Sequence, residues 1–140
     1  MTLDPATLSE GDEITPLELQ PSLGQVIRFC ALNWVFPAFF YDAGAAKAQG
    51  MPGTIVPGPL KIGLIYRAVD EWLGSAGFVR QVRAAHRRPD LTGHPITIVG
   101  RIARVYEEDG ARRADLEMAI INEDNQPSVR GFAVVQFTPR

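Results

Sequence analysis

A long apolar helix followed only by strands constrains the fold of this chain more than any other feature. Residues 59–73 begin with a proline, which suits the first turn of a helix, and apolar residues cover most of the helix circumference. Such a helix is expected to be buried on several sides. The segments after it are typical of long β-strands and cover residues 78–88, 94–106, 111–121 and 128–138. We therefore expect one α+β domain over residues 1–140, in which an antiparallel sheet wraps around a central helix.

The composition supports a single domain in a reducing compartment. A chain of 140 residues with 46% hydrophobic content suits one core, because domains of about 100–150 residues are the commonest. The net charge of −2 gives no general reason to bind nucleic acid, and no apolar run approaches the about 20 residues that span a bilayer. Cys30 has no second cysteine to pair with, so a small buried side chain is expected. The polar, acidic residues 1–11 do not resemble a secretory signal, and we expect a cytoplasmic location.

Three shorter elements are expected before the central helix. Residues 12–20 alternate loosely between apolar and polar and indicate a strand or an extended arm. Ser22 can cap the helix that follows it, because its side chain can accept from a free N–H of the first turn. Asp42 can cap a short helix over residues 43–49 in the same way, and Gly50 is a suitable end for that helix.

The loops on either side of the short helix carry a recognisable pattern. Residues 29–42 read FCALNWVFPAFFYD, and residues 50–60 read GMPGTIVPGPL. This pattern resembles the MaoC-like hydratase and dehydratase family, in which an Asn-Pro-Ile-His run precedes Tyr-Asp and a Val-His-Gly-Pro-Leu run opens the next helix. The resemblance covers nearly the whole chain and is weakest before Pro21. It implies the hot-dog fold, whose long antiparallel sheet would wrap around a central helix at about residues 59–73.

The resemblance also implies a reaction. Family members of the R-specific type add water reversibly across the double bond of an enoyl thioester. The acyl group is carried on coenzyme A or on a phosphopantetheine arm, and no further cofactor is implied. Such chemistry needs a base, an acid, and donors that hold the thioester oxygen as it gains charge. In the family, a histidine and its carboxylate or carboxamide partner supply the first two, and main-chain N–H groups at the start of the central helix supply the third.

At the positions of this dyad, the chain has no group that can transfer a proton. Alignment on Tyr41 and Asp42 places Phe40 at the position of the catalytic histidine and Val35 at about the position of its partner. Pro57 stands where the family pattern has a second histidine. Loss of one such group already costs orders of magnitude in rate. The usual proton transfer is therefore predicted to be abandoned or relocated.

If the chemistry is relocated, the candidate catalytic residues are Asp42, Tyr41 and Asn33. Asp42 could act as a base if burial raised its pKa, while Tyr41 or Asn33 could donate a hydrogen bond to the substrate. A helix cap is the alternative role of Asp42. The two histidines offer no substitute, since His86 and His94 are expected at solvated strand or loop positions. No motif indicates a metal.

A second set of residues is assigned to ligand binding, and its members are Gly58, Trp34, Phe36, Phe40, Arg87 and Arg88. The N–H of Gly58 could hold the thioester oxygen, although the glycine could equally serve only as a tight turn into the helix. Arg87 and Arg88 could bind the phosphates of the carrier, or simply form a charged strand face. The aromatic residues could line an acyl pocket or lie in a dimer interface, and core packing is a further alternative for Trp34.

Three functions follow from these assignments. The first is a non-catalytic subunit, a pseudoenzyme that pairs with a related, active hot-dog subunit in a heteromeric hydratase or dehydratase. The second is a lyase, isomerase or cyclase that acts on a thioester or polyketide-like substrate. The third is a binding module for an acyl chain or another apolar molecule. The expected partners are such a ligand and a second hot-dog subunit, identical or related, with no nucleic acid and no membrane.

Overall fold

One curved antiparallel sheet forms most of the molecule in this computed structural model, which describes residues 2–139. Its five strands lie in the order β1-β3-β4-β5-β2. Their bounds are β1 Leu17–Leu19, β2 Gly77–His86, β3 Ile96–Glu108, β4 Ala111–Asn122 and β5 Pro127–Phe137. The four long strands expected after the central helix are confirmed. The extended arm expected over residues 12–20 contributes only the short edge strand β1.

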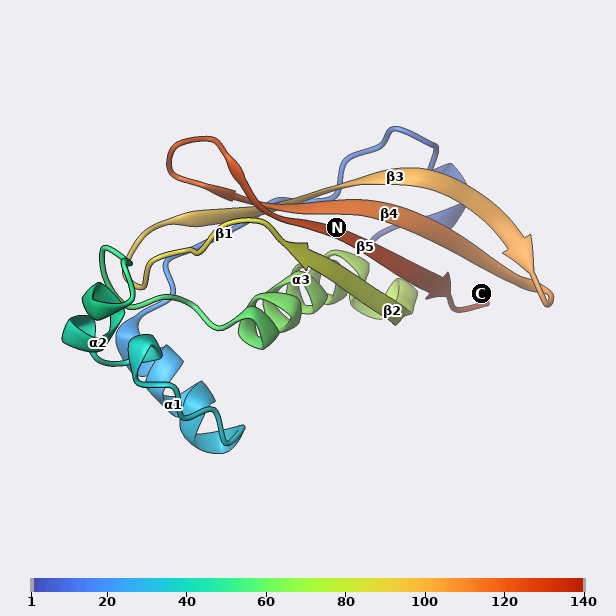
Figure 1. Cartoon of the computed structure of the whole chain (residues 1–140). Helices are drawn as coiled ribbons and strands as arrows, with labels where there is room; N and C mark the ends of the chain where they lie inside the picture. The colour runs from blue at the N-terminus through green and yellow to red at the C-terminus, as the bar shows by residue number, and fades with distance from the viewer. Residues whose placement is uncertain (1, 140) are drawn as a thin grey trace.

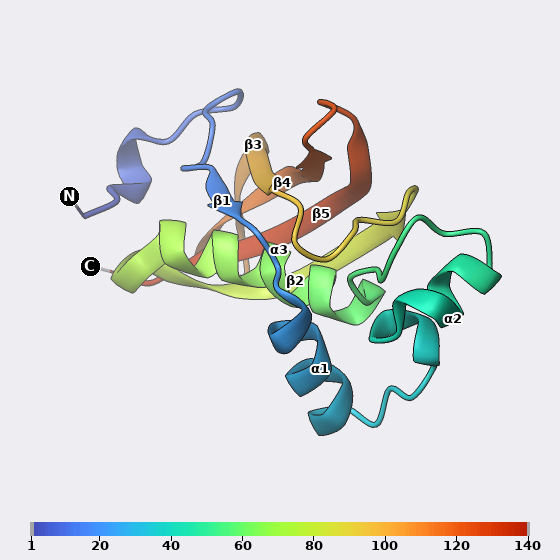
Figure 2. The same ribbon diagram turned by 90° about the vertical axis from the view of Figure 1, so that its left-hand side faces the viewer.

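The central helix α3, Gly58–Leu73, lies against the concave face of the sheet (Figures 1 and 2). Its buried side presents Leu64, Ile65, Ala68, Val69 and Leu73. They pack into one core with inward-facing sheet residues, including Ile98, Ile102, Leu116, Ile120, Val129 and Val135. Wrapping the sheet around this helix removes both apolar surfaces from water. The expected α+β hot-dog architecture is therefore confirmed.

The opposite side of α3 is open, although the apolar sequence of this helix predicted burial on several sides. Ile62 and Tyr66 are exposed there, and so is Phe78 at the start of β2. The reason is geometric, because one sheet covers only one side of the helix. These apolar side chains remain uncovered within the single chain.

Residues 22–52 project from the sheet as a separate unit, called the overhang below (Figures 1 and 2). It contains α1 (Leu23–Leu32), the 3₁₀ turn η2 (Ala38–Phe40) and α2 (Ala43–Ala48). The remaining described residues form the body, which also carries two further 3₁₀ turns, η1 (Pro5–Thr7) and η3 (Gly74–Ala76). Both predicted helices of the overhang are confirmed, including the Ser22 cap, whose Oγ accepts from the N–H of Gln25 at 3.1 Å.

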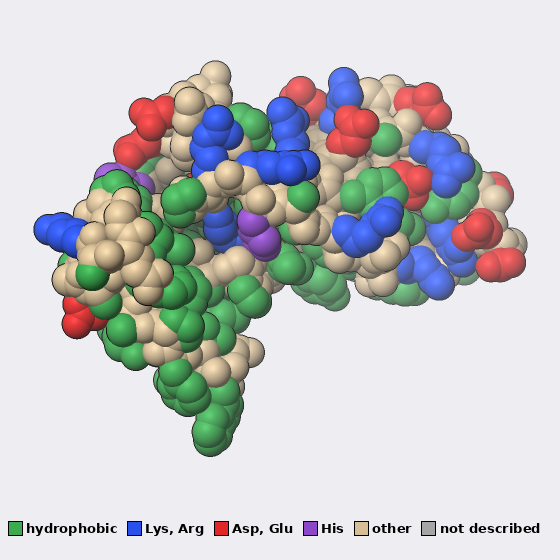
Figure 3. Space-filling model, viewed as in Figure 1, with side chains coloured by type: hydrophobic (Ala, Val, Ile, Leu, Met, Phe, Trp, Pro, Cys, Tyr) green, Lys and Arg blue, Asp and Glu red, His purple; other side chains and the backbone are tan. Residues whose placement is uncertain are grey.

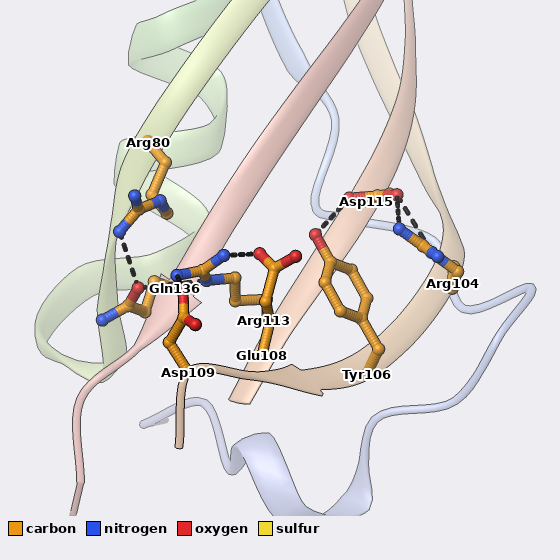
Figure 4. A network of polar contacts seen from close by, with 8 residues as sticks. All are labelled: Arg80, Arg104, Tyr106, Glu108, Asp109, Arg113, Asp115 and Gln136. Carbon is orange, nitrogen blue, oxygen red and sulfur yellow. Dashed lines mark hydrogen bonds and ion pairs between the residues drawn. The ribbon is translucent and has the colours of Figure 1, made fainter. Parts of the chain in front are cut away.

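The β3–β4 hairpin turns at Asp109-Gly110, where both residues have positive φ angles of 53° and 73°. This is the combination that a tight two-residue hairpin requires. Near the hairpin, on the sheet face opposite α3, two charged side chains, Arg113 and Asp115, are almost fully buried, and each has its own polar partners (Figure 4). Arg113 contacts Glu108, Asp109 and Gln136, and Asp115 accepts from Tyr106 and Arg104. These contacts satisfy the buried charges at this end of the sheet.

Candidate functional site

The start of α3 is the first part of the candidate site. Pro57 precedes the helix, Gly58 is its first residue and Pro59 follows. The first N–H groups of any helix lack partners within the helix, and a proline has no N–H at all. Gly58 and Leu60 are thus the helix residues that can offer free N–H groups here, because the N–H of Lys61 already bonds to the carbonyl of Pro57 at 3.1 Å. The helix dipole makes this end favourable for an oxygen that gains negative charge.

Gly58 is packed against the side chain of His86. A Cβ atom on Gly58 would lie 3.0 Å from Nε2 of His86 and 3.3 Å from two carbon atoms of the ring. The φ angle of Gly58 is not in the left-handed region. Backbone conformation therefore does not require a glycine at this position, whereas a Cβ atom would require the imidazole to shift by a few tenths of an ångström. The interpretation of Gly58 as a residue needed only for a tight turn is not supported by this geometry.

His86 ends β2 and is exposed on one side, as expected for a solvated strand position, but the other side of its ring rests on the start of α3. This partial burial lowers the pKa of His86 below its ordinary value, and the positive charge of Lys61 lowers it further. The negative charge of Asp90 acts in the opposite direction. The imidazole is thus neutral at physiological pH, with one nitrogen that donates and one that accepts.

Three buried polar residues, Lys61, Asp90 and Ser128, lie behind this contact and are called the Lys61 cluster below. Nζ of Lys61 is 2.8 Å from Oδ2 of Asp90, and only 3% and 1% of the two side chains are exposed. The same amine donates to the carbonyl oxygen of Arg88 at 3.1 Å, and Oγ of Ser128 donates to Oδ2 of Asp90 at 2.6 Å. The N–H groups of Arg87 and Arg88 both donate to the carbonyl of Ser128. The cluster therefore fixes the end of β2 against the first turn of α3.

Arg87 and Arg88 directly follow His86, so the structure places them at the same corner as Gly58. Both side chains are exposed. Arg88 donates to the carbonyl of Pro127 at 3.3 Å, which is a weak restraint. Figure 3 shows Lys and Arg side chains gathered on the body above the largely apolar overhang. The residues predicted to contact the thioester carbonyl and the carrier phosphates thus lie at one end of α3.

The predicted catalytic residues of the overhang make local contacts. Oδ1 of Asp42 accepts from the N–H of Ala45 at 3.0 Å, so Asp42 caps α2. The hydroxyl of Tyr41 donates to the carbonyl of Phe36 at 2.8 Å, and the side-chain amide of Asn33 donates to the carbonyl of Phe29 at 2.9 Å. Each side chain supports the backbone of its own loop. Their catalytic roles stay predictions.

The aromatic residues of the overhang are distributed over its surface. Trp34 is 80% exposed and Phe36 61% exposed, and their rings meet edge to face with centroids 5.7 Å apart. Core packing of Trp34 within this chain is therefore wrong. Phe40 and Val35, at the dyad positions, are half-buried. Cys30 is buried as expected, and burial raises the pKa of its thiol.

Sequence reasoning missed the Lys61 cluster, although one signal for it was present. Lys61 precedes Leu64, Ile65 and Ala68 by three, four and seven residues, which places it on the buried side of the helix. A lysine there requires a buried partner. Asp90 carries no comparable signal, because the residues around it have the composition of an ordinary turn.

His94, the other histidine, is exposed, and its Nδ1 lies 2.5 Å from Oε1 of Glu123.

Residues 2–139 lack two further kinds of feature. No group of three or more His, Cys, Asp and Glu side chains there is arranged to hold a metal ion. No helix in that range combines the length and the apolar character needed to cross a bilayer.

Comparison with known proteins relates this geometry to solved structures. No family model and no curated protein sequence matches the chain. The (R)-hydratase from A. caviae involved in PHA biosynthesis superposes with a TM-score of 0.86 at 22% identity, over 94% of this chain and 98% of the hydratase. A MaoC-like dehydratase from Rhodospirillum rubrum superposes with a TM-score of 0.83 at 14% identity, over 96% of each chain.

A third neighbour is a complex of two named components. The ChsH1-ChsH2 complex from Mycobacterium tuberculosis contains a chain that superposes with a TM-score of 0.82 at 17% identity, over 93% of this chain and 98% of that chain. Identities this low establish the fold alone. The chain thus has the hot-dog fold of the MaoC-like hydratases and dehydratases.

Proposed function

We propose that this chain binds an acyl thioester as the non-catalytic subunit of a heteromeric hydratase or dehydratase of the MaoC-like type. The observation that carries the proposal is a contrast between two parts of the chain. The start of α3 keeps N–H groups suited to a thioester oxygen, while the family resemblance places Val35 and Phe40 at the positions of the proton-transferring pair. Neither an alkyl nor a phenyl side chain exchanges protons. The partner subunit would therefore supply the base and the acid.

The surface of α3 and β2 supports a partner of similar architecture. β2 is an edge strand of the sheet, so it has unpaired backbone groups that another strand can bond. Exposed apolar side chains lie nearby on Ile62, Tyr66 and Phe78. A second hot-dog domain placed along this edge would cover them. The ChsH1-ChsH2 neighbour is itself a complex of two components, which makes a heteromer a reasonable assembly for this fold.

A heteromer fits the residues better than a homodimer does. Two identical copies would bring together two sites that both have Phe40 in place of the histidine. A related subunit with an intact dyad would give the assembly one complete reaction centre. Arg87 and Arg88 would hold the carrier phosphates of coenzyme A or of a phosphopantetheine arm.

The test is reconstitution with a related hot-dog subunit that has an intact dyad. We expect native mass spectrometry to show a mixed assembly, and crotonyl-CoA hydration to require both subunits. Replacing the dyad histidine of the partner with alanine should abolish turnover without preventing assembly, which would place the chemistry in the partner. Full hydration activity of this chain alone would overturn the proposal.

A further inference from the structure

We propose that His86 is a ligand-binding residue whose imidazole N–H and the main-chain N–H of Gly58 together hold the carbonyl oxygen of an acyl thioester. The choice of ligand rests on the proposed function. The choice of residue does not, since it rests on the contact between His86 and Gly58. Four features of the site support this role: the distance between the donors, the number of donors, the free state of the ring, and its support.

The two donors are close enough to share one oxygen. Nε2 of His86 lies 3.0 Å from the Cβ position of Gly58. That position is about 2.5 Å from the nitrogen of Gly58 by standard geometry, so the two nitrogens are at most about 5.5 Å apart. An oxygen that accepts from both at about 2.9 Å allows a separation of up to about 5.8 Å. The separation therefore allows one carbonyl oxygen to accept from both.

The start of α3 has few free main-chain donors, and the imidazole adds one beside Gly58. Pro59 has no N–H, and the N–H of Lys61 is already bonded to Pro57, so Gly58 and Leu60 keep the free N–H groups of the first turn. A carbonyl oxygen that gains charge is stabilised by donors that converge on it. The ring of His86 packs on Gly58 and can provide a side-chain donor there. Gly58 makes this possible because a larger residue would press on the ring.

The imidazole is available to a ligand. It makes no side-chain hydrogen bond to any other residue between 2 and 139, and the residue is exposed. A neutral ring carries one N–H and keeps no counter-ion that a ligand would have to displace. The ring nitrogens thus have no partner among the described residues, while the contact with Gly58 fixes the position of the ring.

The Lys61 cluster provides the support. It bonds the residues directly after His86 to β5 and to the first turn of α3 through Arg88 and Ser128. The cluster is almost fully buried, so its bonds hold the strand end against the helix in a low-dielectric setting. Lys61, Asp90 and Ser128 are therefore positioning residues that act through His86.

A pair of coenzyme A ligands tests the carbonyl contact. Butyryl-CoA has the thioester carbonyl, and S-butyl-CoA, a thioether, has the same chain without that oxygen. Calorimetry is done on the full chain, in the assembly that it forms in solution. It should show tighter binding of butyryl-CoA than of S-butyl-CoA. His86→Ala should lower the affinity for butyryl-CoA about fivefold, as expected for the loss of one hydrogen bond, and leave the affinity for the thioether unchanged. His86→Gln, which keeps an N–H donor, should retain most of the affinity.

The control is His94→Ala, which removes the other exposed histidine and should change neither affinity. A second readout is the infrared carbonyl stretch of ¹³C-labelled butyryl-CoA, which should move to lower frequency on binding and move less with His86→Ala. If His86→Ala lowers the affinity for both ligands equally, or for neither, the role of His86 is overturned while the proposed function stands. Failure of the unmodified protein to bind either ligand would overturn the proposed function as well.

Discussion

The body encloses most of its large apolar side chains, apart from Ile62, Tyr66 and Phe78, whereas the overhang turns several of its own outward. Ile65, Ile98 and Leu116 are fully buried in the body. In the overhang, Leu32 is 81% exposed and Trp34 80% exposed, and burial is confined to small or medium side chains on α1 and α2. The body therefore has a core that stabilises its own fold, while the overhang has few buried side chains and adds to the apolar surface suited to a partner.

The polar residues of the two regions differ in the same way. In the body, Lys61 and Asp90 are joined across 29 positions of sequence and bind α3 to the sheet. In the overhang, Asp42 and Tyr41 bond to backbone groups only three and five positions away. Substitutions should therefore have global effects in the body and local effects in the overhang.

The largest effect is expected from Lys61→Met. The substitution leaves the buried carboxylate of Asp90 without its cation, and breaking such a pair from one side costs about 3–5 kcal/mol. Urea unfolding monitored by circular dichroism measures the loss. Arg67→Ala is the matched control, because the Arg67–Glu71 pair lies on the exposed side of the same helix and should contribute little. Equal small losses would remove the distinction between the buried and exposed pairs.

A pair of leucines tests the apolar side of the comparison. Leu116→Ala should destabilise the body by about 2–5 kcal/mol, because the cavity cannot close fully. Leu32→Ala should leave unfolding of the isolated chain nearly unchanged and weaken its association with a hot-dog partner instead. Unfolding and analytical ultracentrifugation of both variants separate these outcomes. A large loss of stability from Leu32→Ala in the free chain would show that the overhang is not built for a partner.

A smaller and local effect is expected at Asp42. Asp42→Ala removes the cap of α2 and should cost about 1 kcal/mol, with the lost hydrogen-exchange protection confined to the overhang. Asp42→Asn keeps an acceptor oxygen and should be nearly neutral. It also tests the catalytic prediction for Asp42, since loss of turnover by a folded Asp42→Asn assembly would assign the carboxylate a role in the reaction.

The smallest effect concerns pH. The pKa of His86 is lowered in the folded protein, so the folded state binds this proton less readily than the unfolded state does. The resulting stability is present above the ordinary histidine pKa and is lost as pH falls through the folded value. Titration by NMR is simple, because the chain has two histidines and His94→Gln leaves a single imidazole signal. A pKa at or above the ordinary value would contradict the packing of this ring on Gly58.

Sequence patterns predicted the elements well because periodicity and capping are local. The helix over 59–73 and the caps at Ser22 and Asp42 all follow from residues close together in the chain. The contact between Gly58 and His86 could not be predicted, since it depends on how the end of β2 meets the start of α3.

The same limit applied to Trp34. An apolar residue in an apolar loop is compatible both with a core and with an interface, and only the folded chain shows that its own core does not cover it. The buried lysine of α3 had a helical-phase signal, but its partner Asp90 lay in an ordinary turn.

The central claim is that the body binds a thioester whose chemistry this chain does not perform. The most direct measurement incubates the purified chain with crotonyl-CoA in ¹⁸O-labelled water and follows both binding and product by mass spectrometry. We predict that crotonyl-CoA is retained by the protein and that no ¹⁸O enters it until a partner with an intact dyad is added. Incorporation of ¹⁸O by the chain alone, at a rate comparable to that of the mixed assembly, would contradict the account.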